Sequence, residues 1–167
     1  MLEIVKYPNK ILRRRSKKVA DFSDLAIREL IPKMLETMRL ADGLGLAAPQ
    51  INQSLRIIVI NSKNGPEALI NPKVVWKSFF KKQVFEEGCL SFPGIFGLVR
   101  RYYWIILKYQ DQNGQSQKIK VHGLLATVLQ HELDHLSGIL FIDKILKFTK
   151  GESKVKELMS QAKSGER

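Results

Sequence analysis

The chain has 167 residues, 44% of them hydrophobic and 26% charged, which is the composition of a globular domain and excludes a disordered chain. Its 28 Lys and Arg residues outnumber 16 Asp and Glu, and the formal net charge of +12 favours polyanionic neighbours such as nucleic acid or anionic lipid. Cys89 is the single cysteine, which excludes an intrachain disulfide and a disulfide-held secreted scaffold.

The beginning of the chain carries no targeting pattern. It has no continuous apolar segment, and the basic cluster at residues 13–15 follows the apolar residues instead of preceding them, the reverse of a secretory signal. No apolar run in the sequence approaches the roughly 18 residues of a membrane span. We therefore expect a cytoplasmic protein, in a reducing compartment and without a membrane partner.

Apolar residues at helical spacing predict a first helix over residues 23–40, with Ser23 or Asp24 as its N-cap. Pro32 lies inside this pattern. Because proline removes a backbone donor and crowds the carbonyl four residues earlier, we expect the helix to kink or split near Ile31.

Between residues 55 and 122 the sequence changes to short β-branched and aromatic runs, which are typical of strands. The pair Asn71-Pro72 indicates a turn, and Asn113-Gly114 between two alternating runs is a strong hairpin signal. Short connections of this kind predict antiparallel pairing. The runs that predict strands are 56–61, 74–76, 84–87, 101–109 and 118–121.

Helical spacing returns over residues 124–137, where we expect a buried helix that ends at Gly138 in a left-handed cap. Residues 152–162 predict an amphipathic helix within a basic helical tail over about residues 145–167. No repeat or linker divides the chain, so we expect one catalytic domain over residues 1–167. The predicted fold class is α+β, with antiparallel or mixed sheets packed around the buried helix, an N-terminal helix and a C-terminal basic helix.

The buried helix contains a candidate metal site, the H-E-x-x-H sequence of residues 131–135. This spacing places His131 and His135 one turn apart on one face of the helix. Glu132 lies beside that face, where its carboxylate can take a proton from a water without being a ligand. The alternative is two ordinary histidines on a solvated helix, which the apolar surroundings disfavour.

Catalytic metal sites of this kind usually have three protein ligands and one open position, so the third ligand decides the class. Phe141 stands where a metzincin has its third histidine, which excludes that class. Glu152 or Glu157 could be the third ligand, as in a short metallopeptidase, but both lie in the basic tail. His122 lies at the end of a strand, where a surface role is commoner than metal binding. Cys89 follows a glycine at the end of a strand and would complete a Cys-His-His site, although a small buried thiol is a common alternative.

Residues 43–48, GLGLAA, match the loose dinucleotide-binding pattern. We reject that interpretation because a helix precedes the loop and Pro49 follows it, whereas a dinucleotide loop follows a strand and begins a helix. Gly45 would let a substrate backbone approach closely, and Gln50 would offer an amide donor to a reacting carbonyl oxygen. A role as a simple helix terminator fits the loop equally well.

Three segments in this order resemble the signature motifs of the peptide deformylases: GLGLAAPQ at 43–50, EGCLS at 87–91 and QHELDH at 130–135. The resemblance covers about the first 145 residues, and the EGCLS form and helical tail are similar to the bacterial type 1 branch. The resemblance also extends to Tyr7-Pro8, to residues 36–38, to residues 70–72 and to residues 138–141.

The resemblance implies metal-dependent removal of the formyl group from N-formylmethionine at the start of nascent chains. It implies one divalent metal, Fe(II) natively with Zn, Ni or Co as substitutes. The implied metal ligands are Cys89, His131 and His135. Glu132 would carry the proton, while Gln50 and the backbone N–H of Leu90 would stabilise the oxyanion.

The resemblance also implies how substrate is held. Arg101 would pair with Glu87 beside the site, and Gly45 would lie close to the substrate backbone. Three of the expected pocket residues and ligands, Leu124, Val128 and His131, share one face of the predicted helix. The residues implied to line the methionine pocket are Leu44, Phe85, Leu124 and Val128.

The expected partner is the formylated nascent peptide, bound by a monomer. The family resemblance further suggests that the basic tail docks on ribosomal RNA, with a solvated amphipathic helix as the alternative. A short metallopeptidase that uses a downstream Glu, or a basic RNA-binding module, are the competing functions; no RNP or KH signature supports the latter. The tail lysines are Lys144, Lys147, Lys150, Lys154, Lys156 and Lys163.

Overall fold

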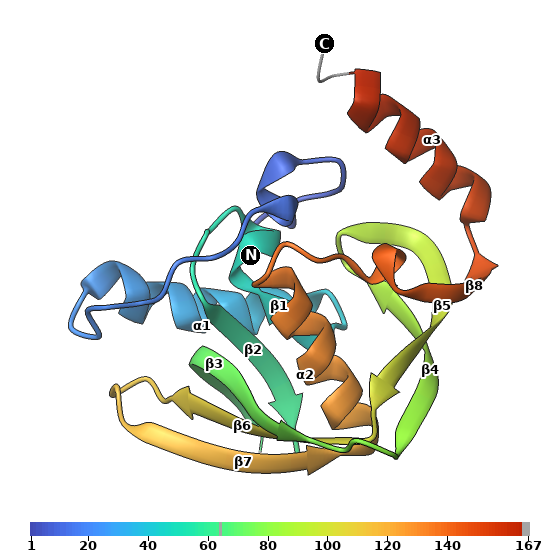
Figure 1. Cartoon of the computed structure of the whole chain (residues 1–167). Helices are drawn as coiled ribbons and strands as arrows, with labels where there is room; N and C mark the ends of the chain where they lie inside the picture. The colour runs from blue at the N-terminus through green and yellow to red at the C-terminus, as the bar shows by residue number, and fades with distance from the viewer. Residues whose placement is uncertain (64, 165–167) are drawn as a thin grey trace.

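The computed structural model describes residues 1–63 and 65–164, and the fold class is α+β, as predicted (Figure 1). The strands form two antiparallel sheets. The larger sheet has the order β1-β2-β3-β6-β7 and the smaller one the order β4-β5-β8. Their bounds are β1 Gly45–Ala47, β2 Ile57–Ser62, β3 Gly65–Lys77, β4 Lys82–Cys89, β5 Phe92–Tyr102, β6 Trp104–Gln110, β7 Ser116–His122 and β8 Ile145–Lys150.

Helix α1 spans Leu25–Leu40 and begins at Asp24, whose side chain accepts a hydrogen bond from the Ala26 N–H. The helix runs without interruption through Pro32, so the expected split near Ile31 does not occur. Pro32 and Arg28, the residue whose carbonyl loses its partner, both lie on the exposed side of the helix. That carbonyl can bond to water, and the buried opposite side of the helix stays packed.

Strand β3 continues through Asn71-Pro72, where the sequence predicted a turn. The register with β6 shifts there, and Asn71 takes a left-handed backbone conformation with φ of 52°. Its side chain amide donates to the Val19 carbonyl oxygen at 2.8 Å, so the irregularity ties the N-terminal segment to the sheet. The turn signal therefore marks a bulge within a strand.

The expected strand over residues 101–109 is divided between two sheets. Strand β5 ends at Tyr102 and β6 begins at Trp104, with Tyr103 at the corner. The predicted hairpin at Asn113-Gly114 is confirmed, since it joins β6 to β7 and Gly114 has a φ of 78°. Strand β1 and the first half of β5 carry glycines and prolines that weaken a strand pattern, and the sequence did not predict them.

Two helices cover opposite faces of the larger sheet. Helix α1 packs against buried residues such as Ile57 and Val59 of β2, whereas α2, Gly123–His135, packs against the alternate residues Ile58 and Ile60. Alternation along the strand explains this arrangement, because successive side chains point to opposite faces. The smaller sheet packs beside α2 (Figure 1) and has a core of its own around Phe92 and Phe141.

The C-terminal segment differs from the expected helical tail over residues 145–167. Ile145–Lys150 is strand β8, which pairs with the free edge of β5, and α3 spans Glu152–Ser164. Gly151, with a φ of 78°, separates the strand from the helix. The predicted lysine Lys163 and the rest of the chain end have side chains outside the described residues. Within the described part, no helix is long and apolar enough to cross a bilayer.

Candidate metal centre and active site

Helix α2 carries the H-E-x-x-H sequence in its last turns. His131 and His135 are both buried, and their ring centroids lie 5.0 Å apart. The helix ends close by at Gly138, which has a φ of 72°. A Cβ atom at Gly138 would come within 2.3 Å of the Arg13 carbonyl oxygen, so glycine is required there by both conformation and space.

Strand β4 brings Cys89 to the two histidines. One potential ligand atom from each of Cys89, His131 and His135 lies within 4.8 Å of the other two. The Cys89 sulfur is 3.2 Å from Nε2 of His135. The three side chains therefore converge on one point from two elements that are more than 40 residues apart in the sequence.

The other candidates for a third ligand do not join this group among the described residues. His122 is exposed at the end of β7, where its ring stacks on that of Tyr103 with 6.2 Å between the ring centroids. Glu152 and Glu157 are exposed on α3, where Glu152 pairs with Lys156. Phe141 packs against the His131 ring, with 5.8 Å between centroids, and supplies no ligand atom.

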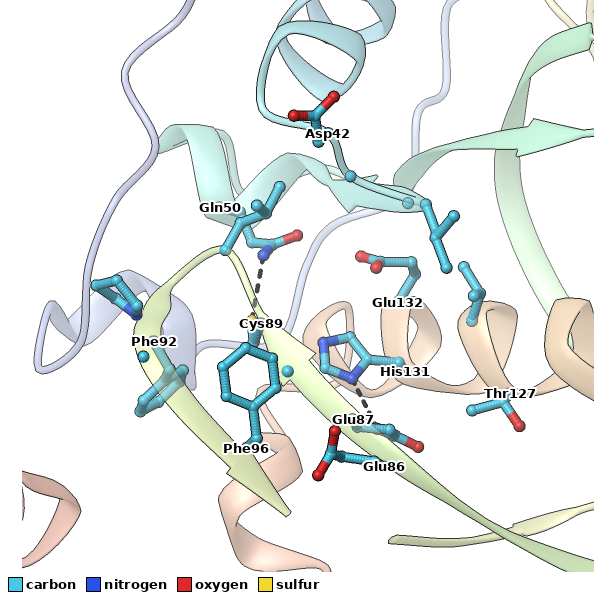
Figure 2. Close-up of a pocket in the computed structure, with 18 of the residues that line it drawn as sticks. Asp42, Gln50, Glu86, Glu87, Cys89, Phe92, Phe96, Thr127, His131 and Glu132 are labelled. Carbon is cyan, nitrogen blue, oxygen red and sulfur yellow. Dashed lines mark hydrogen bonds and ion pairs between the residues drawn. The ribbon is translucent and has the colours of Figure 1, made fainter. Parts of the chain in front are cut away.

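His131 is oriented from behind by a buried ion pair. Its Nδ1 lies 2.9 Å from Oε2 of Glu87 (Figure 2), and Glu87 accepts two hydrogen bonds from Arg101, at 2.7 and 2.8 Å. Burial opposes ionisation of Glu87, but the hydrogen bonds from Arg101 and His131 outweigh it and lower its pKa to about 2. Glu87 is thus an ionised acceptor that leaves Nε2 of His131 for a ligand.

Arg101 connects this ion pair to two further charged residues. Its guanidinium also donates to Asp134, and Lys144 donates to both carboxylate oxygens of Asp134 at 2.7 Å each. The sequence indicated the Glu87–Arg101 pair by resemblance but gave no sign of Asp134 and Lys144, because their roles depend on a contact between α2 and the segment before β8. Arg101 is therefore fixed on both sides.

The donor set fits a divalent cation. One thiol and two imidazoles suit borderline metals such as zinc and iron. Burial opposes the charged form of His131, yet its hydrogen bonds with Cys89 and Glu87 raise its pKa, so the surroundings attract positive charge to this point. Burial and the neighbouring charge of His131 lower the pKa of His135, whose imidazole stays neutral and able to donate a lone pair.

Glu132 lies near Cys89 and His131 (Figure 2) and is almost wholly buried. Among the described residues, no group hydrogen-bonds its Oε2 atom. Burial raises the pKa of Glu132 to about 7, only partly offset by the charge of His131. A carboxyl group that is poised near neutral pH and has an unpartnered oxygen can both accept and return a proton.

Gln50 comes from the short 3-10 helix η2, Ala48–Ile51, which follows β1. Its side chain oxygen accepts a hydrogen bond from the Ala47 N–H at 2.8 Å. This contact directs Nε2 of Gln50 toward Cys89 Sγ at 3.5 Å (Figure 2) and toward Ser91 Oγ at 3.4 Å. The amide N–H groups are therefore held at the site, as a donor to a reacting oxygen requires.

A cavity of about 540 Å³ opens beside Cys89 and Glu132. Phe85 and Arg101, which we expected among the substrate-binding residues, are not in its wall as the described residues define it. Phe85 is about one third exposed on β4, and Arg101 lies buried behind Glu87. The expected residues that do line the cavity are Leu44, Gly45, Gln50, Glu87, Cys89, Leu90, Leu124, Val128, His131 and Glu132.

The wall also contains residues that the sequence did not indicate. Lys6 reaches the cavity from the N-terminal segment and donates from Nζ to the Leu90 carbonyl oxygen at 2.6 Å. Phe96 covers Gly88, where a Cβ atom would lie 2.6 Å from its ring. Thr127, on α2, shares a face with Leu124 and His131, and this spacing was the one signal that could have identified it.

Comparisons with known proteins agree with one another. A sequence profile described as polypeptide deformylase matches residues 1–151. A peptide deformylase of Endomicrobium trichonymphae is 45% identical over 168 residues, which cover 99% of this chain and 98% of that protein.

Solved structures show the same relationship. The crystal structure of a Thermotoga maritima peptide deformylase is similar with a TM-score of 0.83 and 43% identity, covering 87% of this chain and 97% of that one. A Synechococcus elongatus peptide deformylase in complex with actinonin gives a TM-score of 0.84 and 37% identity, covering 96% and 85%.

Proposed function

The chain belongs to the peptide deformylase family, metallohydrolases that remove the formyl group from the N-terminus of nascent polypeptides, and we propose which of its residues carry out the reaction. The observation that supports the assignment is the convergence of Cys89, His131 and His135 within 4.8 Å beside buried Glu132. Cys89, His131 and His135 hold the metal. A cation there supplies Lewis-acid chemistry, lowering the pKa of a water and polarising the formyl carbonyl.

Glu132 is the proton carrier. It accepts a proton from the attacking water at its free Oε2 atom and later gives this proton to the nitrogen of the departing amine. The pKa of about 7 that burial gives Glu132 supports both steps, because the group is neither a strong acid nor permanently protonated near neutral pH. Its position beside the histidines, without being a ligand, keeps the carboxyl group free for this exchange.

Gln50 and the backbone N–H of Leu90 stabilise the charge that develops on the formyl oxygen. The Ala47 N–H holds the Gln50 side chain in place through Oε1, so the amide need not reorganise during the reaction. Losing one preorganised donor of this kind typically costs about 2.7–4 kcal/mol of barrier.

The methionine side chain occupies the apolar end of the cavity. Leu44, Leu124 and Val128 supply its walls, and Gly45 admits the substrate backbone next to Glu132. Glu87 and Arg101 position His131 and do not contact the methionine side chain. Phe85 stays a proposed contact for residues beyond the methionine, since it is partly exposed on β4.

The physiological metal is Fe(II), with Zn, Ni or Co able to replace it. The mixed sulfur and nitrogen donor set accepts any of these ions, so the choice depends on availability and on oxidation. A thiolate ligand makes the site sensitive to oxygen, because oxidation of Cys89 or of Fe(II) would end activity. Purification without oxygen is therefore required for the assay below.

The protein acts as a monomer on formylated nascent chains and docks on ribosomal RNA through its tail. Lys147 and Lys150 of β8 are exposed and support this role, whereas Lys144 is already paired with Asp134 and Lys156 with Glu152. The double variant Lys147→Gln/Lys150→Gln should lower co-sedimentation with ribosomes and weaken its salt dependence. If co-sedimentation were unchanged, the basic tail would be better explained as a solvated amphipathic segment.

The test of the proposed function compares two peptides. Protein purified without oxygen, with its metal content measured, is given formyl-Met-Ala-Ser and the same peptide without the formyl group. We expect release of formate from the first and no cleavage of the second. Hydrolysis of peptide bonds in the second would instead indicate a metallopeptidase.

A further inference from the structure

The face of the larger sheet that α1 covers over β1 and β2 continues across β6 and β7, where it carries a row of lysines. Lys73 of β3 pairs with Lys108 of β6, and Lys108 pairs with Lys118 of β7. All three are exposed, and Lys120 lies two residues further along β7 on the same face. We call Lys73, Lys108, Lys118 and Lys120 the lysine face.

Like charges directly opposite one another on neighbouring strands destabilise a sheet. No acidic residue lies within the strand segments that build this face: residues 73–85, 104–110 and 116–122 contain no Asp or Glu. These segments therefore carry positive charge with no acidic residue of their own, which an anionic partner would relieve.

An apolar tip lies at one end of the lysine face. Phe79 and Phe80 occupy the turn between β3 and β4, where their exposed fractions are 67% and 104%. The ring of Trp76 contacts that of Phe79, with 6.4 Å between the ring centroids. The Ser78 hydroxyl closes this turn by donating to the Lys81 carbonyl oxygen. Turns are normally built from Gly, Pro, Asn, Asp or Ser, so two bare phenylalanines there need another reason.

Apolar exposure is concentrated in this part of the sequence. Of the 15 exposed large hydrophobic residues in the described part of the chain, six fall within residues 75–85. Lysines surround them: Lys77 lies 4.3 Å from the centre of the Tyr102 ring, and Lys81 lies 4.0 Å from that of Tyr103. The arrangement is an apolar projection with ammonium groups around its base.

A second cavity, of about 310 Å³, lies at the start of β4, which follows the tip in the sequence. Lys82 and Tyr102 line it together with Arg100, and the Lys82 ammonium lies 5.8 Å from the Tyr102 ring centre. Lys144 also lines the cavity, but its ammonium is already paired with Asp134. The cavity thus offers Lys82 and Arg100 to a small anionic group, and Lys82 lies two residues along the chain from Phe80.

We propose that the lysine face and the tip formed by Trp76, Phe79 and Phe80 dock on a lipid bilayer with anionic headgroups. The phenylalanines enter the acyl boundary, Trp76 lies at headgroup depth, and the lysines contact the anionic surface. A headgroup phosphate fits the cavity beside Lys82. Docking of this kind needs no membrane-spanning segment, so the absence of a long apolar run in the sequence does not oppose it.

Two features favour a bilayer over single-stranded nucleic acid. Phe80 is fully exposed and Phe79 is about two thirds exposed, as insertion requires, whereas base-stacking rings need only one free face. The sheet face carries lysines and no arginine, and lysine is a compact charge suited to a diffuse anionic surface, while arginine is the usual choice for nucleic acid. The chemistry of the patch therefore points to lipid.

The test is co-sedimentation of the full chain with phosphatidylcholine vesicles that contain or lack phosphatidylglycerol. We expect binding only where phosphatidylglycerol is present, with a blue shift of Trp76 fluorescence measured in a Trp104→Phe background. The double variant Phe79→Ser/Phe80→Ser should bind about tenfold or more weakly, because two apolar side chains no longer leave water. The triple variant Lys108→Gln/Lys118→Gln/Lys120→Gln should also bind these vesicles more weakly than the parent chain.

Matched controls place equal changes elsewhere on the surface. Leu25→Ser/Leu146→Ser removes two exposed apolar side chains, and Lys10→Gln/Lys17→Gln/Lys63→Gln removes three charges; both should bind vesicles like the parent. Deformylase activity of each variant reports folding. Equal losses in tip variants and controls, or no vesicle binding, would overturn the proposal. The proposal would also be overturned if the chain bound polyuridylate, and not vesicles, through Phe79 and Phe80. A dimer that depends on the tip would overturn it as well.

Discussion

Gly45 lies directly against the carboxyl group of Glu132. A Cβ atom on Gly45 would come within 2.8 Å of Glu132 Oε1 and 3.0 Å of a methyl group of Val128. Two segments that are almost 90 residues apart in the sequence thus meet at the proposed proton carrier. The glycine is needed for space next to Glu132, which explains the composition of the loop better than a helix-terminating role does.

Gly45→Ala should therefore displace Glu132 and lower turnover on the order of 10²-fold, while metal content stays unchanged. Gly43→Ala is the control, since its nearest side chain contact is the flexible end of Leu90 at 3.0 Å. Steady-state formate release and metal analysis of both variants would check this. Equal activity of the two variants would contradict the proposed crowding at Glu132.

Glu132→Gln should retain metal and lose roughly 10²–10⁴-fold in turnover, because an amide has the shape of the carboxyl group but cannot carry the proton. Glu36→Gln, an exposed change on α1, should behave like the parent. Substantial activity in Glu132→Gln with full metal content would remove the proton-carrier role from this residue.

Cys89→Ser and His135→Asn should each weaken metal binding by at least the roughly 10–100-fold that loss of an outer partner costs. The comparison variant is His122→Asn, which changes an exposed histidine away from the site. Metal content after dialysis against a chelator would separate them. If Cys89→Ser held as much metal as His122→Asn, the sulfur would not be a ligand.

The low pKa of Glu87 gives a prediction for stability against pH. Its folded pKa of about 2 lies below the ordinary value of 4.5, so ionised Glu87 stabilises the fold above pH 4.5, and this stability is lost as the pH falls toward 2. Arg101→Met removes the main stabilising partner and should move acid unfolding to higher pH. It should also cost about 3–5 kcal/mol near neutral pH, the usual effect of breaking a buried ion pair.

Arg13→Met is the matched control for that experiment, because Arg13 pairs with Asp143 where both side chains are about one third exposed. Surface pairs of this kind are worth about 0–1 kcal/mol. Urea unfolding followed across the pH range would distinguish the two. An acid transition of Arg101→Met that coincides with that of the control would show that Arg101 does not set the ionisation of Glu87.

Local patterns in the sequence predicted much of the fold. The periodicity of residues 124–137 and the glycine after them predicted α2, and alternation predicted the larger part of β2, β6 and β7. Pro32 misled the prediction because the cost of a proline depends on whether the freed carbonyl faces water, which only packing decides. Strand β8 was included in the predicted helical tail because its partner edge on β5 is distant in the sequence.

The sequence predicted those parts of the candidate site that lie within its motifs. The spacing of His131 and His135 places both on one helix face, but Cys89 could be preferred only by elimination and by family resemblance. Asp134, Lys144 and Lys6 were not predictable, because each contributes through a contact between distant segments. The resemblance paired Arg101 with Glu87, as the structure shows, and the cavity wall also contains Thr127 and Phe96, which the sequence did not indicate.

The measurement that tests the account most directly is X-ray absorption at the metal edge of the zinc-loaded protein. We expect one sulfur at about 2.3 Å and two imidazole nitrogens at about 2.0–2.1 Å, with the sulfur lost in Cys89→Ser. A first shell made only of nitrogen and oxygen in the parent protein would contradict the proposed Cys-His-His site.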